Sequence, residues 1–421
     1  MKVLVFNCGS SSVKFQVIET SLEMIEANAD KTLARGLVEK IGLSDSRLVI
    51  EVEGRKPYQE ISEILDHRTA VERVLKALVH PDHGVLKSVK EIEAVGHRVV
   101  HGGEKFASSV LVTPEVEAMI EECVVLAPLH NPHNLRGLTA ARSLLPGVPH
   151  VAVFDTAFHQ SMPPEAFIYG LPYELYRRHA IRRYGFHGTS HRFVSIRTAR
   201  LLDRPLEDVR IVTCHLGNGC SMAAVDRGHS VDTTMGFTPL EGLLMGTRSG
   251  DLDAAILPWV MTMEDVTLSQ LNAMLNKHSG LYGISGVSSD MREIEHARAT
   301  GNKRARLAFE IFCYRIRKYV GAYAAAMGGL DAVTFTGGIG ENSSLVRETS
   351  LSGMEFLGIE LDQEANRTAP RGKEVLVSRS GSRVAVAVVP TNEERVIARD
   401  TARVLGGVMP SFAVPGTEAP R

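Results

Sequence analysis

The sequence lacks the features that mark several specialised classes of protein. No apolar run approaches the roughly 20 residues that span a bilayer. The N-terminus has no charged segment before an apolar stretch, as a secretory signal would have. No C-x-x-C pair occurs, which argues against a disulfide framework or a cysteine zinc site. We therefore expect a cytoplasmic protein with no membrane partner, whose five scattered cysteines stay reduced: Cys8, Cys123, Cys214, Cys220 and Cys313.

An excess of charge of either sign is also missing. The chain has 47 Lys and Arg residues against 49 Asp and Glu residues, and its formal net charge is −2. Proteins that bind nucleic acid through its phosphates usually carry a strong basic excess. We therefore expect no nucleic-acid partner, and any phosphate must be bound by a local site rather than by a basic surface.

Three common motifs of catalysis and nucleotide binding are absent. The sequence has no G-x-x-x-x-G-K-[ST], which excludes a Walker-type P-loop. Gly338-x-Gly340 is not followed by the third glycine of G-x-G-x-x-G, which excludes the usual dinucleotide fingerprint. No H-E-x-x-H or Cys/His cluster provides a zinc site. A nucleotide site in this chain must therefore be of another type.

An alternation of strand and helix patterns runs through the chain. Its 421 residues, 44% of them apolar, suffice for two domains of the usual size, roughly 100–200 residues each. Thr113-Pro114 is typical of a helix start, and residues 303–327 predict a long helix. Apolar runs at 147–154, 332–335 and 384–389 predict strands. The alternation predicts an α/β fold.

Two further predictions concern the end of the chain. Thr391 and Glu394 fit a capping box, which predicts that a helix begins there. Residues 409–421 are rich in Pro, Gly and Ala and show no periodicity. That composition predicts a disordered tail.

Two hairpins of the same design lie in the two halves of the chain, at 3–18 and 211–226. Their turns, 7–12 and 215–221, are rich in Gly, Ser and Asn, and a third glycine-rich turn at 336–342 also follows a strand. Backbone N–H groups in such turns can cradle phosphate oxygens, because glycine lets the main chain approach a ligand closely. The alternative is that these residues only make tight turns. The repetition favours two related domains that face one nucleotide.

Three loops combine basic or histidine residues with glycine: 96–103, 183–191 and 245–251. An Arg flanked by Gly and Ser has little steric cover, and its planar guanidinium suits bidentate recognition of phosphate or carboxylate. A surface ion pair is the alternative for each Arg, and a structural imidazole for each His. Asn7 and Glu393 offer oxygen atoms that suit Mg²⁺, although either residue could equally cap a helix.

The chain resembles the acetokinase family, within the superfamily of acetate and sugar kinases, heat-shock chaperones and actin. The matching motifs occur in the family's order and reach to about Gly407. They are FNCGSSSVKFQV at 6–17, GHRVVHGG at 96–103, LAPLHNP at 126–132, VFDTAFH at 153–159, RYGFHGTSH at 183–191, HLGNG at 215–219, MGTRSGD at 245–251, TGGIGEN at 336–342 and PTNEE at 390–394. Cys8 and Cys220 stand where the family more often has Ala.

The resemblance implies two actin-like domains with ribonuclease-H-like cores, derived from an ancient duplication, with the active site in the cleft between them. The N-terminal domain would comprise residues 1–153 and 392–408, and the nucleotide-binding domain residues 154–391. The resemblance also implies a homodimer. The implied reaction is reversible, Mg²⁺-dependent transfer of the γ-phosphoryl group of ATP to acetate, which gives acetyl phosphate and ADP.

Site residues carry over position by position. Asn7 and Glu393 would hold Mg²⁺, with Mn²⁺ as an alternative. Catalysis would fall to Asp155, His187, Arg248 and Arg98, and Arg98 would also hold the acetate carboxylate. The acetate methyl group would contact Val100, Leu129, Phe186 and Pro239. ATP would contact Ser10, Ser12, Lys14, His215, Leu216, Gly217, Asn218, Gly219, Asp290, Met291, Arg292, Gly338, Ile339, Gly340, Glu341 and Asn342.

Charge logic bears on the role of Asp155. Acetate is already an anion and needs no general base. The catalytic problem is therefore to hold acetate in line with the phosphoryl group and to stabilise the negative charge that spreads during transfer. We therefore expect Asp155 to orient Arg98, Arg248 or a metal-bound water rather than to donate a proton.

Two other functions fit parts of the sequence. The first is a kinase for propionate or another short-chain carboxylate, because one methylene in an apolar pocket is worth only about 1–3 kcal/mol. The second is a nucleotide-dependent assembly or chaperone protein of the same fold. Arg98 and Arg248 in small-residue loops argue against the second, since an ATPase switch would not need them.

Overall fold

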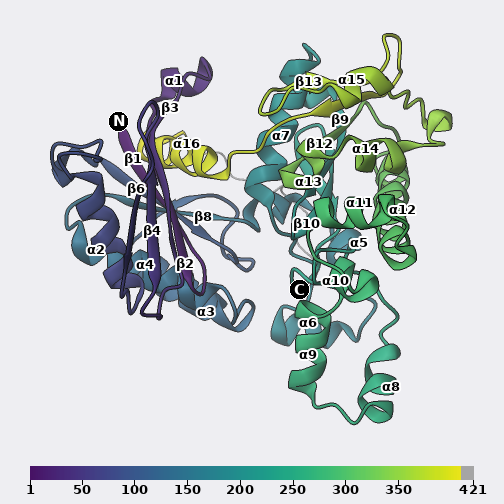
Figure 1. Ribbon diagram of the computed structural model, residues 1–421, viewed down its shortest axis with the longest axis horizontal. Helices are drawn as coiled ribbons and strands as arrows, with labels where there is room; N and C mark the ends of the chain where they lie inside the picture. Colours follow the sequence, from purple (N-terminus) through teal and green to yellow (C-terminus); the bar gives the residue numbers. More distant parts are fainter. Residues whose placement is uncertain (409–421) are drawn as a thin grey trace. The chain divides into compact units, whose positions relative to one another are not determined.

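The computed structural model describes residues 1–408 and divides them into two compact units (Figure 1). Among the described residues, the first unit comprises Met1–Phe158 and residues 392–408, and the second comprises His159–Thr391. The first boundary thus lies after Phe158 rather than after residue 153, so Asp155 belongs to the first unit. The predicted disordered tail, 409–421, lies outside the described residues.

The described residues of the first unit form an eight-stranded sheet in the order β5-β4-β3-β2-β1-β6-β8-β7. β1 pairs antiparallel with β2 and parallel with β6, and β6 pairs parallel with β8. The strands are β1 (Lys2–Cys8), β2 (Ser12–Glu19), β3 (Lys31–Glu39), β4 (Ser46–Glu51), β5 (Tyr58–Ser62), β6 (Ala94–Val99), β7 (Val110–Leu111) and β8 (His150–Phe154).

Alternate side chains of β1 face opposite layers of helices. Leu4 and Phe6 pack in the core cluster that includes α2 (His67–Leu78) and α4 (Asn131–Leu144). Val3 and Val5 pack against α16 (Glu393–Leu405). The period of two along a strand makes this possible, because successive side chains point to opposite faces. Residues 3–6 of this strand are all apolar, and its polar side chains stand at the two ends, at Lys2 and at Asn7 before the turn.

The second unit contains a six-stranded sheet within the described residues, in the order β11-β10-β9-β12-β14-β13. Helix α7 (Gly188–Leu201) packs on β9 and β12, and α12 (Lys303–Ala326) packs on β9 and β10; Figure 1 shows these two helices on opposite sides of the sheet. The strands are β9 (Arg210–Leu216), β10 (Cys220–Asp226), β11 (His229–Thr233), β12 (Ala332–Thr336), β13 (Val375–Leu376) and β14 (Ala385–Val388).

The two sheets share a six-stranded topology, which β4 and β5 extend in the first unit. In the shared part, three antiparallel strands in chain order are followed by two strands that run parallel to the first, and a short antiparallel strand closes the edge. β1 and β9 occupy the same position, and each is followed by a glycine-containing turn into its hairpin partner. The predicted α/β fold is confirmed, and the repeated hairpin of the sequence proves to be the start of a repeated sheet.

The remaining helices lie around these sheets. They are α1 (Leu22–Glu26), α3 (Pro114–Glu122), α5 (Pro164–Phe167), α6 (Tyr173–His179), α8 (Ile256–Met263), α9 (Leu268–Lys277), α10 (Gly280–Ser285), α11 (Met291–Ala299), α13 (Gly337–Asn342), α14 (Ser344–Leu351) and α15 (Gln363–Arg367). The predicted helix start is confirmed, because Thr113 caps α3 and Pro114 is its first residue.

The predicted capping box is wrong. Asn392, not Thr391, is the N-cap of α16, and its side chain accepts a hydrogen bond from the backbone N–H of Arg395 at 2.9 Å. Thr391 instead lies 2.9 Å from the Ser190 hydroxyl within the second unit. Asn is as good an N-cap as Thr, so tertiary contacts decided between two acceptable start positions.

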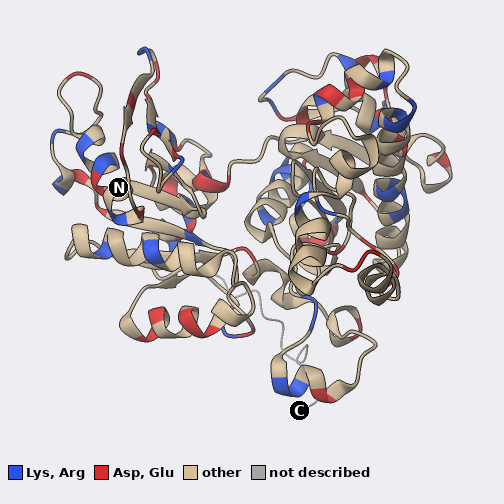
Figure 2. Ribbon diagram, turned by 60° about the horizontal axis from the view of Figure 1, so that its bottom comes forward, with Lys and Arg blue, Asp and Glu red and all other residues tan. Residues whose placement is uncertain are grey.

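Charged residues of both signs are interspersed over the ribbons of both units (Figure 2). Among residues 1–408, none of the helices combines the length and the apolar character that a bilayer span requires.

Candidate active site

Arg98 and Asp155 meet at the ends of two parallel strands. Arg98 lies on β6, and Asp155 directly follows its neighbour β8. The guanidinium donates from Nε to Asp155 Oδ1 at 3.0 Å and from Nη2 to Oδ2 at 2.6 Å. Such a bidentate pair fixes the plane of the guanidinium as well as its position. The Asp155 side chain is 1% exposed and that of Arg98 is 20% exposed, so the pair is sheltered but still reachable.

Two predicted metal ligands lie beside this pair. Asn7, near the end of β1, accepts a hydrogen bond from Arg98 Nη1 at 3.3 Å. Glu393, the first residue of α16, places Oε2 3.9 Å from Arg98 Nε. Four of the predicted site residues therefore meet in the first unit, although they come from four separate segments of the chain.

Burial and neighbouring opposite charges shift the pKa values of Arg98 and Asp155 in opposite directions. Burial raises the pKa of Asp155 above its ordinary value, although Arg98 acts in the other direction. Burial alone would lower the pKa of Arg98, but Asp155 and Glu393 raise it overall. Arg98 is therefore a permanent cation. Burial, followed by the charge of Glu393, also raises the pKa of Glu394, against the influence of Lys14 and Arg98.

Helix α4 holds the loop that follows Arg98. Asn134 Oδ1 accepts from the Val100 N–H at 3.0 Å, and its Nδ2 donates to the Cys8 carbonyl at 2.7 Å. Asn131 bonds both the N–H and the carbonyl of His101. Both amides are buried. Sequence reasoning missed these two residues, since Asn near a helix start normally indicates a cap, and only their place beneath the loop reveals a positioning role.

The four residues predicted for the acetate methyl group differ in exposure. In the first unit Val100 is buried, whereas Leu129 is 62% exposed. In the second unit Phe186 is buried and Pro239 is half-buried; the Pro239 carbonyl accepts from Arg248 Nη1 at 3.0 Å. Their common role as a methyl pocket stays a prediction.

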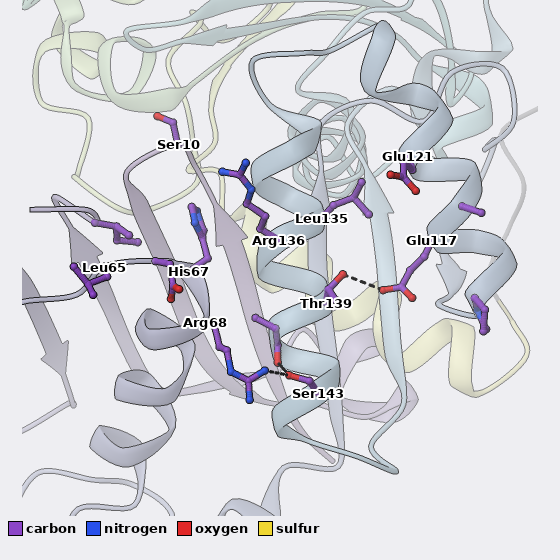
Figure 3. Close-up of a pocket in the computed structure, with 15 residues that line it drawn as sticks. Ser10, Leu65, His67, Arg68, Glu117, Glu121, Leu135, Arg136, Thr139 and Ser143 are labelled. Atoms are coloured by element: carbon purple, nitrogen blue, oxygen red, sulfur yellow. Dashed lines mark hydrogen bonds between the residues drawn. The ribbon is translucent and has the colours of Figure 1, made fainter.

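The residues in and after the first hairpin turn that are predicted to contact phosphate differ in their exposure and surroundings. Lys14 is exposed, and Ser12 is half-buried. Ser10 lines a cavity of about 920 Å³ that also contains His67, Arg68, Arg136 and Glu117. In Figure 3 the labelled basic side chains come from α2 and α4 and the labelled acidic ones from α3; Arg68 is bonded to Ser143, and Glu117 to Thr139. Because its charges are mixed, this cavity does not specify one kind of ligand.

In the second unit, His187 and Arg248 approach the second hairpin turn. His187 caps α7 in the left-handed region, with φ of 55°, a conformation that non-glycine residues adopt rarely and that often marks a functional site. A Cβ atom built on Gly219 would lie 3.6 Å from Arg248 Nη1 and 3.8 Å from His187 Cε1. The missing side chain thus keeps open the space between the two predicted catalytic groups. Burial lowers the pKa of Arg248, yet a guanidinium stays charged.

Many of the predicted ATP residues line one cavity of about 780 Å³. This volume lies within the usual range for a small-molecule site. Sequence reasoning missed Ser289, Glu295, Ser343 and Arg371 on its wall. The predicted residues on the wall are Gly217, Asn218, Asp290, Met291, Arg292, Gly338, Ile339 and Asn342.

The other predicted ATP residues of this unit are not on that wall. His215 bonds to Ser190 through Nδ1 at 2.8 Å, and Leu216 is buried in β9. Glu341 accepts hydrogen bonds from the N–H groups of Gly337 and Thr391, so its carboxylate supports the backbone. Gly340 is buried, and its carbonyl accepts from Arg347.

Comparison with known proteins identifies the family. The model of the acetokinase family matches residues 2–399.

The chain belongs to the acetokinase family.

This member is 55% identical to the acetate kinase of Caldanaerobacter subterraneus subsp. tengcongensis over 409 residues. The matched region covers 97% of this chain and 100% of that one. Its structure matches the crystal structure of Porphyromonas gingivalis acetate kinase with a TM-score of 0.91 at 50% identity, covering 96% and 99% of the two chains. It also matches a propionate kinase from Francisella tularensis subsp. tularensis with a TM-score of 0.87 at 40% identity, again over 96% and 99%. As a member of this family, the protein is a kinase that transfers a phosphoryl group from ATP to a carboxylate.

Proposed function

We propose that this protein is an acetate kinase, which transfers the γ-phosphoryl group of ATP reversibly and directly to acetate. The observation that carries the proposal is the bidentate pair of Arg98 with Asp155, beside the oxygen atoms of Asn7 and Glu393. A cation of fixed orientation next to oxygen ligands suits a small anion that must approach a polyphosphate.

Arg98 would bind the acetate carboxylate. Asp155 occupies two of the five guanidinium N–H groups and Asn7 a third. Counting the contacts of the described residues, two N–H groups are left for an anion. Asp155 holds the guanidinium in place, so it acts on acetate through Arg98. No proton transfer is needed, because acetate attacks as an anion.

Asn7 and Glu393 fit Mg²⁺. Both offer oxygen atoms, and Mg²⁺ in kinases is often held by only one or two protein oxygens plus waters and substrate phosphates. Within residues 1–408 there is no cluster of three or more His, Cys, Asp or Glu residues that could hold a metal by itself, which agrees with such a sparse site. When bound, Mg²⁺ or Mn²⁺ would neutralise phosphate charge.

The second unit would bind ATP and stabilise the transferring group. The cavity lined by Asn218, Asp290 and Gly338 would take the nucleotide. His187 and Arg248, beside Gly219, would donate to the phosphoryl oxygens during transfer, where loss of one such donor typically costs about 10²–10³ in rate. The expectations that the active site lies between the units and that the protein is cytoplasmic stay predictions.

A homodimer is proposed on the basis of α8. None of the residues in this helix is buried, although its sequence is ILPWVMTM. Trp259 is 61% exposed and Met263 is 62% exposed, and Ile256 is also exposed. An apolar helix that lies open to water is typical of a surface that another protein covers. A second copy of this chain is the proposed occupant.

Acetate is favoured over propionate as substrate, because the more similar relatives are acetate kinases and the propionate kinase is less similar. The test is formation of acyl hydroxamate by the purified protein with ATP, Mg²⁺ and acetate, propionate or butyrate. We expect the highest kcat/KM with acetate. A failure to form any acyl phosphate would overturn the proposal, and a higher kcat/KM with propionate would correct the substrate.

A further inference from the structure

His187 is the end of a chain of hydrogen bonds that runs into the core of the second unit. Its Nδ1 lies 2.8 Å from Ser221 Oγ, and that same oxygen lies 2.7 Å from His191 Nε2. His191 Nδ1 lies 2.7 Å from Thr213 Oγ1. Ser221, His191 and Thr213 are each 0% exposed. Bulk water therefore does not reach these three side chains.

The direction of the chain is set at Thr213. Its hydroxyl has a single proton and two acceptors within reach, His191 Nδ1 at 2.7 Å and the Ala223 carbonyl at 3.4 Å. Hydroxyl hydrogen bonds normally measure about 2.5–3.0 Å, so the contact with His191 is the stronger of the two, and we assign the hydroxyl proton to it. Burial, followed by the charges of His159 and His215, holds the pKa of His191 well below its ordinary value. His191 is therefore neutral and carries its only ring proton on Nε2.

The rest of the chain follows from this proton. The Nε2–H of His191 donates to Ser221 Oγ, so the Ser221 hydroxyl must donate to the remaining partner, His187 Nδ1. His187 then accepts at Nδ1 and carries its proton on Nε2. A charged His187 would also hold a proton on Nδ1. Both ring nitrogens that contact Ser221 would then be donors, and neither could accept the hydrogen of its hydroxyl group.

The Nε2 side of His187 faces the second hairpin turn. A Cβ atom built on Gly219 would lie 3.9 Å from His187 Nε2. Titratable groups that face His187 within this unit include His215, whose ring stacks at 4.2 Å, His191 through Ser221, and Arg248 across Gly219. Burial raises the pKa of the neighbouring Cys220 to about 12, so this thiol does not supply a negative charge beside His187.

We infer that Thr213, His191 and Ser221 are positioning residues that hold His187 as the neutral tautomer with its proton on Nε2. His187 then contributes a directed hydrogen bond to the transferring phosphoryl group, and Arg248 contributes the positive charge. The hydrogen bond of one ring nitrogen commonly sets what the other can do. The catalytic role of His187 in this inference rests on the proposed function, but the assignment of its tautomer does not.

The tautomer can be measured without any assay of activity. In protein labelled with ¹⁵N-histidine, two-bond proton–nitrogen correlations report which ring nitrogen of His187 carries the proton, and the variant His187→Asn identifies its signal. We expect the Nε2–H form at neutral pH and a mixture of tautomers in Ser221→Ala. The control is Ser230→Ala, which removes an equally buried hydroxyl bonded to His159 Nδ1 at 2.7 Å and should leave the His187 signal unchanged. An Nδ1–H or doubly protonated His187 in the unmutated protein would overturn the inference.

Kinetics then test the catalytic meaning. We expect Ser221→Ala to lower kcat about 10–100-fold, as the loss of groups that orient a functional histidine commonly does, with little change in the KM for ATP. The deficit should shrink at acid pH, because a protonated His187 carries a proton on Nε2 without help from Ser221. Thr213→Val should act in the same direction, and Thr213→Ser should restore activity.

Two kinetic results would count against this role: a deficit that is the same at every pH, or a deficit that Ser230→Ala reproduces. If the unmutated protein made no acyl phosphate, the proposed function would fail, while the ¹⁵N spectrum would still decide the tautomer.

Discussion

Arg98 and Asp155 are 57 positions apart in the chain, yet both oxygens of the carboxylate accept from one edge of the guanidinium. The pairing arises because β6 and β8 are parallel neighbours, so their carboxyl ends meet at one edge of the sheet. Ligand groups of α/β sheets gather at this edge. The pair gives the first unit a cation of fixed orientation.

Replacement of Asp155 by Asn should abolish most activity at every pH. The amide cannot accept two charge-assisted bonds, so Arg98 loses its fixed plane, and the expected loss is about 10²–10³ in kcat/KM for acetate. The measurement is a pH profile of the hydroxamate assay. Recovery of activity at low pH would show instead that Asp155 works as an acid.

A matched control for this variant is Asp30→Asn, which weakens another buried ion pair of the same unit, between Asp30 and Arg399. Loss of a partner from a buried pair is typically worth about 3–5 kcal/mol. We expect Asp30→Asn to lower the melting temperature while leaving the KM for acetate unchanged, so the two variants separate loss of stability from loss of the site.

Gly219→Ala should reduce activity without unfolding the protein. The added methyl group would meet Arg248 and His187 at 3.6–3.9 Å, which are ordinary contact distances, so little strain is expected. It would nevertheless fill the space between these two groups and exclude a phosphoryl oxygen. The measurement is kcat with melting temperature beside Gly170→Ala, where nothing lies within 4 Å of the new atom. Equal activity of the two variants would contradict the proposed place of the phosphoryl group.

Trp259→Glu should convert a dimer into a monomer. A charge in the middle of a covered apolar helix must be desolvated, which is costly without a partner. Sedimentation velocity would report the mass, with Ile61→Glu as the control, since Ile61 is 65% exposed on β5 of the other unit. An unmutated protein that sediments as a monomer would refute the proposed dimer.

Stability should fall as the pH drops from about 6.5 toward 4, partly because of buried histidines. Burial lowers the pKa of His150 to about 4 and also lowers that of His97, which lies 2.9 Å away. The unfolded chain binds protons near pH 6.5, while the folded one does not, so this contribution is complete above pH 6.5 and is lost below it. Across this range, the melting temperature of His150→Gln should change less with pH than that of the unmutated protein. Identical slopes would exclude the His97–His150 pair as the cause.

Local signals in the sequence were sufficient for much of the fold. The Thr113-Pro114 start of α3 and the long helix α12 follow from caps and periodicity, which depend only on nearby residues. The strands at 332–336 and 385–388 follow from short apolar runs. The start of α16 did not follow, because Thr391 and Asn392 are both acceptable caps and a contact with Ser190 engages Thr391.

Residue chemistry and motif order in the sequence alone determined the family and the candidate groups for anion, metal and phosphate binding. Only the tertiary structure decided which groups meet: Arg98 with Asp155, and His187 with Ser221 and His191. It also decided that Glu341 and His215 bond to other protein groups instead of lining the cavity of about 780 Å³ in the second unit. The physical reason is that caps and strand patterns are short-range properties. Hydrogen-bond partners and proton positions depend instead on strand pairing and packing between segments that are distant in the chain.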